Sequence, residues 1–266
     1  MAAVIYNLWR RVLNMRKTCP LFLTGLFLVA AAAQAQTVDE FKAPRSACCL
    51  PGTAQRLADQ LQDWNQLGQF YAANEELKKQ PADAKRVVFM GDSITIGWKL
   101  DQSFPGKPYV NRGISGQTTP QMLVRMFPDV IDLKPAAVVI FAGTNDVARN
   151  TGPMTLAMIE ENFQAMTELA QAHGIKVVLC SITPIADYGR AKMSDGRPPA
   201  DILKLNAWLK EYAAKSHAVY CDYFSALVDD KGWLKPGISM DGLHPTADGY
   251  KLMVPLAEAA IAKALQ

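Results

Sequence analysis

The sequence is poor in histidine and cysteine and carries no large excess of either charge. Only three histidines and five cysteines occur among 266 residues, and no pair of them has the close spacing that is typical of a metal site. The formal net charge is +3, and lysine and arginine do not cluster with interleaved aromatic residues, which nucleic-acid binding favours. We therefore expect no metal, no other cofactor and no nucleic-acid partner.

Long apolar runs are also scarce. The longest covers residues 20–33, follows several basic residues and ends in Ala33-Gln34-Ala35. This order is typical of a secretory signal peptide, so residues 1–35 are predicted to be removed after Ala35 and the protein to be periplasmic or secreted. Met15 is an alternative start. An uncleaved membrane anchor is the other interpretation, but it needs about 20 apolar residues, so we expect no stable membrane association after cleavage.

Four cysteines remain after the leader, and the sequence leaves their disulfide pairing open. They are Cys48, Cys49, Cys180 and Cys221, for which three full pairings exist. Cys180 and Cys221 each fall late in a predicted strand. They are therefore expected either as neighbours in a sheet or as ordinary buried thiols.

Residues 36–85 are predicted to form an arm and a helix that precede the main domain. The polar residues 37–52 show no periodicity. Between residues 53 and 79, apolar side chains recur at helical intervals, which predicts an amphipathic helix packed against the main body, with its aromatic residues in the core. These apolar residues are Leu57, Leu61, Trp64, Leu67 and Tyr71.

Residues 86–266 alternate between strand and helix patterns. Strands are predicted over residues 87–90, 109–112, 137–142, 176–181 and 219–223, and helices over 119–133, 155–172, 199–215 and 247–265. Such alternation predicts a single α/β domain of three layers, with a parallel sheet and helices on both faces. In such sheets, functional groups gather beyond the carboxyl ends of the strands.

Ser93 follows the first predicted strand at this edge. The apolar run of residues 87–90 ends at Gly91, so Ser93 is placed in a tight turn before a helix. A serine there can act as a nucleophile, and its own N–H can hold developing negative charge. The alternative is that Ser93 only caps the helix.

A serine nucleophile needs a base, and elimination selects one histidine. His173 and His217 are predicted at the amino ends of strands, the wrong edge of the sheet. His244 lies instead in a polar loop after the last strand, with Asp241 three residues before it. A carboxylate at this spacing can fix one ring nitrogen and leave the other to accept the serine proton. The alternative is an ordinary turn that leads into a helix capped by Thr246.

Three donors are candidates for holding the oxyanion of an acyl-transfer reaction. They are the N–H of Ser93, the N–H of Gly116 and the side-chain amide of Asn145. Glycine permits a close approach of the backbone, and each such donor contributes roughly 3 kcal/mol. Each residue alone also fits an ordinary turn.

Four sequence blocks together resemble the SGNH (GDSL-type) hydrolase family. They are Gly91-Asp92-Ser93, Gly113-Ile114-Ser115-Gly116, Gly143-Thr144-Asn145-Asp146 and Asp241-Gly242-Leu243-His244-Pro245, in the family's order. The resemblance implies a flavodoxin-like, five-stranded parallel sheet and an ester hydrolase without metal. It further implies Ser93, Asp241 and His244 as the catalytic set, and Ser93, Gly116 and Asn145 as the oxyanion hole. Ile94 differs from some relatives, and residues before 86 lie outside the family core.

The sequence narrows the substrate less well. No long apolar segment suggests an interfacial lid, and Trp98, Tyr188 and Trp233 lie in or beside loops near the expected site. Because aromatic faces can carry sugar rings, we expect a short-chain esterase, with acetyl groups on carbohydrate as its substrates. The resemblance also allows an acetylhydrolase, an arylesterase, a lysophospholipase or a thioesterase. An alternative of another class is a carbohydrate-binding module without turnover. The sequence does not determine the oligomeric state.

Overall fold

The structure is a computed structural model that describes residues 61–81, 83–189 and 192–266. The predicted signal peptide, the arm, Cys48 and Cys49 lie outside these residues. The described chain contains one parallel sheet in the order β2-β1-β3-β4-β5. Its strands are β1 (Val87–Gly91), β2 (Tyr109–Gly113), β3 (Ala137–Phe141), β4 (Lys176–Cys180) and β5 (Val219–Cys221). This order confirms the predicted flavodoxin-like fold.

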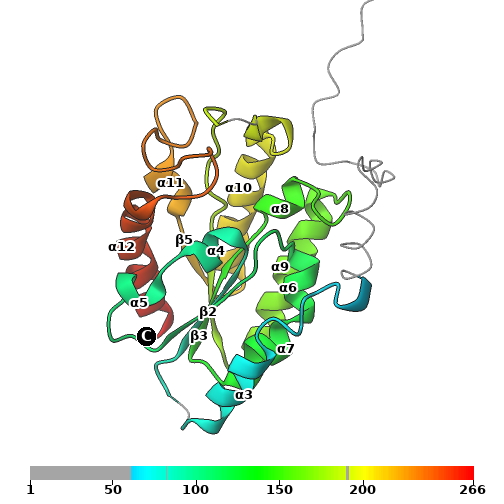
Figure 1. Ribbon diagram of the computed structural model, residues 1–266, viewed down its shortest axis with the longest axis vertical. Helices are drawn as coiled ribbons and strands as arrows, with labels where there is room; N and C mark the ends of the chain where they lie inside the picture. The colour runs from blue at the N-terminus through cyan, green and yellow to red at the C-terminus, as the bar shows by residue number, and fades with distance from the viewer. Residues whose placement is uncertain (1–60, 82, 190–191) are drawn as a thin grey trace, which may run out of the picture. The chain divides into compact units, whose positions relative to one another are not determined.

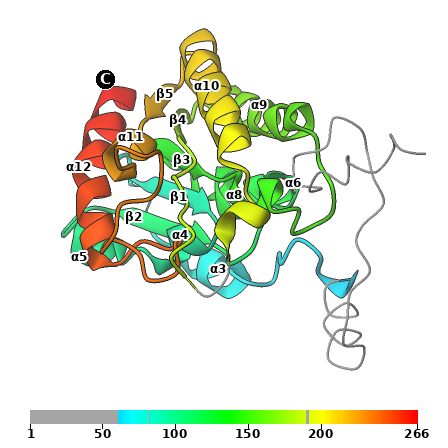
Figure 2. The ribbon, with the colours of Figure 1, turned by 90° about the horizontal axis from the view of Figure 1, so that it is seen from above.

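Helices cover both faces of the sheet, as predicted. Side chains alternate along each strand, so Val88 and Met90 point to one face while Val87 and Phe89 point to the other. The first face packs against α6 (Thr119–Val124), α7 (Met126–Asp129), α9 (Leu156–Ala172) and α10 (Pro199–Lys215). The second packs against α4 (Ser93–Gly97), α5 (Leu100–Ser103), α11 (Tyr223–Leu227) and α12 (Ala247–Ala264). Figures 1 and 2 show α11 and α12 on one side of the strands and α6 and α9 on the other.

The prediction of one continuous amphipathic helix over residues 53–79 is wrong in the part that the structure describes. Residues 63–70 form turns, and α3 covers only Tyr71–Lys79. The Asp63 carboxylate accepts hydrogen bonds from the N–H groups of Leu67 (2.8 Å) and Gly68 (2.9 Å), which offers the backbone an alternative to the helix. The aromatic residues are not core, because Trp64 is 42% and Tyr71 65% exposed.

Two other element boundaries differ from the prediction for local reasons. The segment 119–133 is divided into α6, α7 and the 3₁₀ turn η1 (Ile131–Leu133), because Pro128 has no N–H to continue the helix. Strand β5 ends at Cys221, since the Asp222 carboxylate accepts the N–H of Ser225 at 3.0 Å and begins α11. The remaining short elements are α8 (Thr144–Val147) and η2 (Met193–Asp195).

Cys180 and Cys221 are neighbours in the sheet and are also buried thiols. They are register partners on β4 and β5, and neither is in a disulfide. Among the helices that the structure describes, none has the length and apolar character needed to cross a membrane.

Candidate active site

Ser93 is the first residue of α4, directly beyond the carboxyl end of β1. The turn is tight, because a Cβ at Gly91 would lie 2.8 Å from the Cβ of Thr95. Asp92, not Ser93, caps the helix: its Oδ1 accepts the N–H of Ile94 at 2.9 Å. The alternative in which Ser93 serves only as the N-cap is therefore wrong, and its hydroxyl is available for another role.

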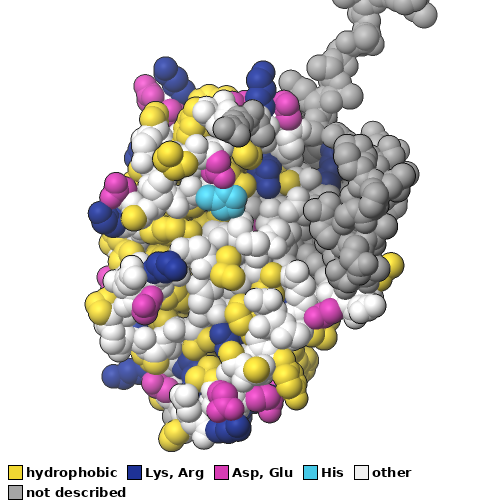
Figure 3. Space-filling view, in the orientation of Figure 1, with side chains coloured by type: hydrophobic (Ala, Val, Ile, Leu, Met, Phe, Trp, Pro, Cys, Tyr) yellow, Lys and Arg dark blue, Asp and Glu magenta, His cyan; other side chains and the backbone are white. Residues whose placement is uncertain are grey.

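The structure brings Ser93, His244 and Asp241 into one hydrogen-bonded chain. The Nε2 of His244 lies 2.9 Å from the Oγ of Ser93, and its Nδ1 lies 2.6 Å from Oδ2 of Asp241. Ser93 is half-buried and His244 is exposed, so the pair can be reached from solvent. Figure 3 shows a histidine ring at the surface of this face, with an acidic side chain beside it. The arrangement can move a proton from the hydroxyl to the imidazole.

The loop before α12 is folded around the Asp241 carboxylate. Its Oδ1 accepts the N–H groups of Leu243 (3.0 Å) and His244 (2.8 Å). Partial burial acts to raise the pKa of Asp241, but hydrogen bonds from the His244 ring and from these N–H groups outweigh it and hold the pKa well below its usual range. Gly242 has φ +84°, and a Cβ there would lie 2.0 Å from the carbonyl oxygen of Ala186, so only glycine fits.

The loops after β1, β2 and β3 meet through the side chain of Asn145. Its Nδ2 donates to the carbonyl oxygen of Gln117 at 3.1 Å and to Oδ2 of Asp92 at 3.3 Å. Gly116, with φ +78°, precedes Gln117. Within the described chain, the N–H groups of Ser93 and Gly116 donate to no other residue. Both hydrogens of the Asn145 amide already have acceptors, so the amide must break one of these hydrogen bonds to donate to a substrate oxygen. The hydrogen bond to Asp92 is the longer of the two.

Two carboxyl groups lie buried behind Ser93. Burial raises the pKa of Asp92 to about 7, against the hydrogen bond from Ile94 and with the help of the nearby Asp146 charge. Burial likewise raises the pKa of Asp146 to about 6, although the hydroxyl and N–H of Thr119 donate to it. Asp92 is therefore partly neutral near pH 7, which makes it a weaker acceptor for the Asn145 amide.

Sequence reasoning missed two residues that contact Asn145, namely Gln117 and Arg197. Arg197 comes from the loop after β4, and its Nη2 donates to Oδ1 of Asn145 at 3.3 Å while its Nε donates to the hydroxyl of Thr144 at 3.1 Å. The loop's position after a strand placed it at the correct edge. A single arginine in a polar loop has no spacing pattern, so no signal in the sequence selected it.

The other histidines and aromatic residues lie away from this chain of contacts. His173 follows α9 and precedes β4, and His217 precedes β5, as predicted. Trp98 is a correction: it is 2% exposed and packs in the core, so it does not face substrate. Trp233 is half-buried, whereas Tyr188 is 45% exposed.

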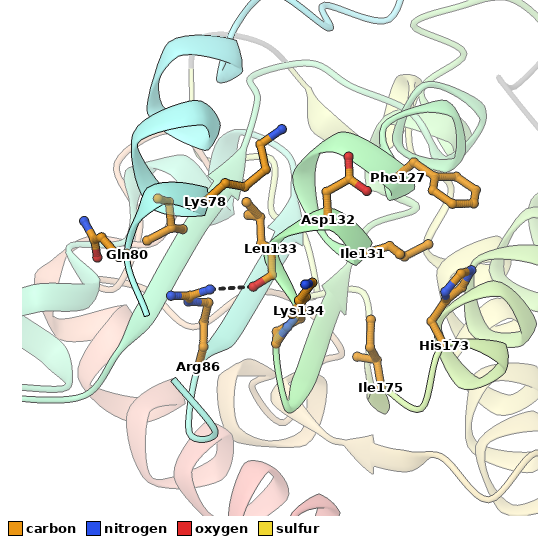
Figure 4. Close-up of a pocket in the computed structure, with 12 residues that line it drawn as sticks. Lys78, Gln80, Arg86, Phe127, Ile131, Asp132, Leu133, Lys134, His173 and Ile175 are labelled. Carbon is orange, nitrogen blue, oxygen red and sulfur yellow. Dashed lines mark hydrogen bonds between the residues drawn. The ribbon is translucent and has the colours of Figure 1, made fainter. Parts of the chain in front are cut away.

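A pocket of about 690 Å³ lies at the opposite edge of the sheet, and none of the predicted site residues lines it. Figure 4 shows Arg86, Lys134 and His173 at its wall, near the amino ends of the strands. The Arg86 guanidinium donates to the carbonyl oxygen of Leu133 at 2.5 Å. The ring of His173 packs edge-on against Phe127. These contacts do not place a nucleophile beside a base.

Comparison with known proteins agrees with the geometry. The model of the GDSL-like lipase/acylhydrolase family matches residues 89–252, a range that holds every candidate site residue. Esterase TesA of Pseudomonas aeruginosa is 30% identical over 183 residues, which cover 64% of this chain and 84% of TesA. A GDSL-like lipase from Bacteroides thetaiotaomicron is 40% identical with a TM-score of 0.70, over 76% of this chain and 99% of that one. The acetyl xylan esterase AlAXEase shares the fold at 22% identity and a TM-score of 0.56, over 66% and 98% of the two chains.

These matches cover the sheet and the loops at its carboxyl edge, and the relatives include an esterase and a lipase. The chain belongs to the GDSL-like lipase/acylhydrolase family of ester hydrolases.

Proposed function

We propose that this protein hydrolyses short-chain acyl esters, acetyl esters of carbohydrate above all, with Ser93, His244 and Asp241 as its catalytic residues. The observation that carries this proposal is the chain of contacts from Ser93 Oγ through the His244 ring to Asp241, at 2.9 and 2.6 Å. Ser93 and His244 come from opposite ends of the domain, so no local turn preference accounts for their meeting. No cofactor enters the reaction.

In the first half of the reaction, His244 accepts the Ser93 proton and Ser93 Oγ attacks the ester carbonyl carbon. The N–H groups of Ser93 and Gly116 and the amide of Asn145 stabilise the oxyanion. The C–O bond to the alcohol then breaks, and His244 returns its proton to the leaving oxygen. In the second half, His244 deprotonates a water molecule that attacks the acyl-enzyme, which releases the acid and restores Ser93.

Asp241 keeps the His244 ring in the tautomer that this sequence of transfers needs. With Nδ1 donating to Asp241, Nε2 has a lone pair for the Ser93 hydroxyl. The depressed pKa of Asp241 keeps the carboxylate charged at neutral pH. That charge also stabilises the imidazolium that forms during attack.

The exposed Tyr188 supports a carbohydrate substrate. It lies next to Gly189, where a Cβ would be 2.6 Å from the carbonyl oxygen of Asp241, so Tyr188 borders the catalytic loop. An exposed aromatic ring can stack on a sugar. The fold is shared with an acetyl xylan esterase, which gives acetylated carbohydrate as the first substrate to test.

A second candidate substrate class is lipid or aromatic esters, as in an acetylhydrolase, lysophospholipase or arylesterase. It is favoured by Met240, which is 84% exposed beside Asp241, and by Ile96, which is 42% exposed on α4. Met240 lies four residues before His244, and Ile96 lies three residues after Ser93. An apolar acyl chain or ring would cover these exposed side chains.

Hydrolysis of p-nitrophenyl esters from C2 to C12, together with acetate release from acetylated xylan, tests both proposals. We expect Ser93→Ala to lose at least about 10⁴-fold in kcat, while Ser115→Ala, a matched change at an exposed serine of the next loop, stays within about twofold. Equal rates for Ser93→Ala and the parent protein would leave only a binding module. A rate maximum at C8 or longer would replace carbohydrate by lipid esters.

We also propose that the protein is exported and loses residues 1–35. The basic, apolar and small-residue pattern of the leader supports this. Mass spectrometry of the protein isolated from its source cells should give a chain that begins at Gln36. A full-length chain in the soluble cell extract would contradict the proposal.

A further inference from the structure

Gln117 is held on two sides by polar contacts. It is 2% exposed, and its Nε2 donates to the carbonyl oxygen of Asn65 at 3.0 Å and to Oε1 of Gln66 at 3.1 Å. Its own Oε1 accepts a hydrogen bond from Nε of Arg125 at 2.8 Å. A buried amide with all these contacts made has a fixed position, because moving it would leave polar groups unpaired.

The contact with Arg125 connects Gln117 to a buried charged network. Arg125 is fully buried and pairs with Asp129, and its Nη2 donates to the carbonyl oxygen of Arg112 at 3.1 Å. Asp129 also accepts the amide of Asn74, on α3, at 2.6 Å. Breaking a buried pair of this kind is strongly destabilising, so the network is a rigid support for the loop after β2.

The backbone of the same residue contacts the candidate oxyanion hole. The carbonyl oxygen of Gln117 accepts the Nδ2 of Asn145 at 3.1 Å. We propose that Gln117 is a positioning residue that sets the direction of the Asn145 amide, and that residues 65 and 66 help to hold it there. This inference rests on the proposed function, in which Asn145 stabilises the oxyanion.

Residues 65 and 66 precede the family match, which begins at residue 89. The support of the oxyanion loop therefore includes a segment of this chain outside the matched domain. That segment makes a second contact: the Nε2 of Gln121 donates to the carbonyl oxygen of Trp64 at 2.6 Å. This second contact supplies a control, because Gln121 holds the same segment without contacting Asn145.

The test compares Gln117→Glu with Gln121→Glu, using p-nitrophenyl acetate as the substrate. A glutamate at 117 still accepts from Arg125 but repels the oxygens of Asn65 and Gln66, so the loop moves. A glutamate at 121 still accepts the N–H of Thr118 but loses the hydrogen bond to the carbonyl oxygen of Trp64. We expect Gln117→Glu to lower kcat about 10- to 100-fold with KM within about twofold, and Gln121→Glu to change kcat by less than about threefold.

A double-mutant cycle with Asn145→Ala separates positioning from general damage to the fold. If Gln117 acts through Asn145, Gln117→Glu lowers kcat by less than about threefold in the Asn145→Ala background. The same fold-loss in both backgrounds, or an equal loss in Gln121→Glu, would overturn the inference. Gln117→Met, which keeps the length without charge, replaces Gln117→Glu if circular dichroism shows that the latter is unfolded. An active Ser93→Ala variant would instead refute the proposed function itself.

Discussion

The two edges of the sheet use their polar residues in different ways. At the amino edge, two of the charged groups at the pocket of Figure 4 have partners: Lys78 pairs with Glu75, and Arg86 donates to the carbonyl oxygen of Leu133. At the carboxyl edge, the N–H groups of Ser93 and Gly116 have no acceptor among the described residues. The pocket is at one edge, and the serine that contacts a histidine ring is at the other.

This difference teaches that the size of a cavity does not locate the chemistry. A reacting group must be held in place on one side and left unpaired on the other. Ser93 meets that condition, because Asp92 caps the helix that carries it and the Ser93 N–H stays open. The amino edge has a histidine as well, but its ring packs on Phe127.

The largest expected effect comes from comparing the removal of the histidine at each of the two edges. We expect His244→Ala to lower kcat by about 10⁴-fold or more, because Ser93 then has no base. His173→Ala should leave kcat within about twofold. Both are measured with p-nitrophenyl acetate. A large loss in the His173 variant would move the reactive site to the pocket edge.

The next effect is expected from Asp241→Asn, at about 10³-fold or more in kcat. The amide would favour the wrong tautomer of the neighbouring ring, although its size is unchanged. In the parent protein, kcat/KM should fall at acidic pH, because a protonated imidazole cannot act as a base. The low pKa of Asp241 means that its own protonation does not contribute to that limb. Activity that persists unchanged to pH 4 would exclude an imidazole base.

The sequence was sufficient to predict the parallel sheet, since the strand patterns are short, apolar and regularly spaced. It also predicted that Ser93, His244 and Asp241 would lie together, because only one histidine follows a strand at the correct edge. It failed at residues 63–70, where hydrogen bonds from the backbone to the Asp63 carboxylate replace the helix that the spacing of the apolar residues predicts. It also failed to identify Gln117 and Arg197, because their roles depend on contacts between distant loops.

A smaller effect is expected from Arg197→Ala, at about 10-fold in kcat. The variant removes the donor to Oδ1 of Asn145, so the amide gains freedom but stays in the site. Arg197→Lys should recover only part of the rate, because lysine cannot donate to Thr144 and Asn145 as a planar fork. An unchanged kcat in Arg197→Ala would remove this residue from the site.

The amino edge gives a contrast in stability. We expect Arg86→Met to lower the free energy of unfolding by about 1–3 kcal/mol, because the carbonyl group of Leu133 loses its buried donor. The kcat for p-nitrophenyl acetate should not change. Urea denaturation measures the first quantity. A fall in kcat with unchanged stability would show that the two edges are coupled.

The smallest effect has the opposite sign and belongs to the carboxyl edge. The pKa of Asp92 is raised from 3.8 to about 7 in the folded protein, so folding takes up a proton between these values and stability falls as the pH rises through that window. Asp92→Asn does not titrate, and its Oδ1 can still accept the N–H of Ile94. We therefore expect its advantage in unfolding free energy to grow from pH 4 to pH 8 and to reach about 1 kcal/mol net, because loss of the acceptor for Asn145 offsets part of the gain. Urea denaturation at both pH values measures this advantage, and one that is the same at pH 4 and pH 8 would contradict the raised pKa. If Asp92→Asn is more stable than the parent protein but has a lower kcat, the reaction needs the Asp92 charge although this charge destabilises the fold.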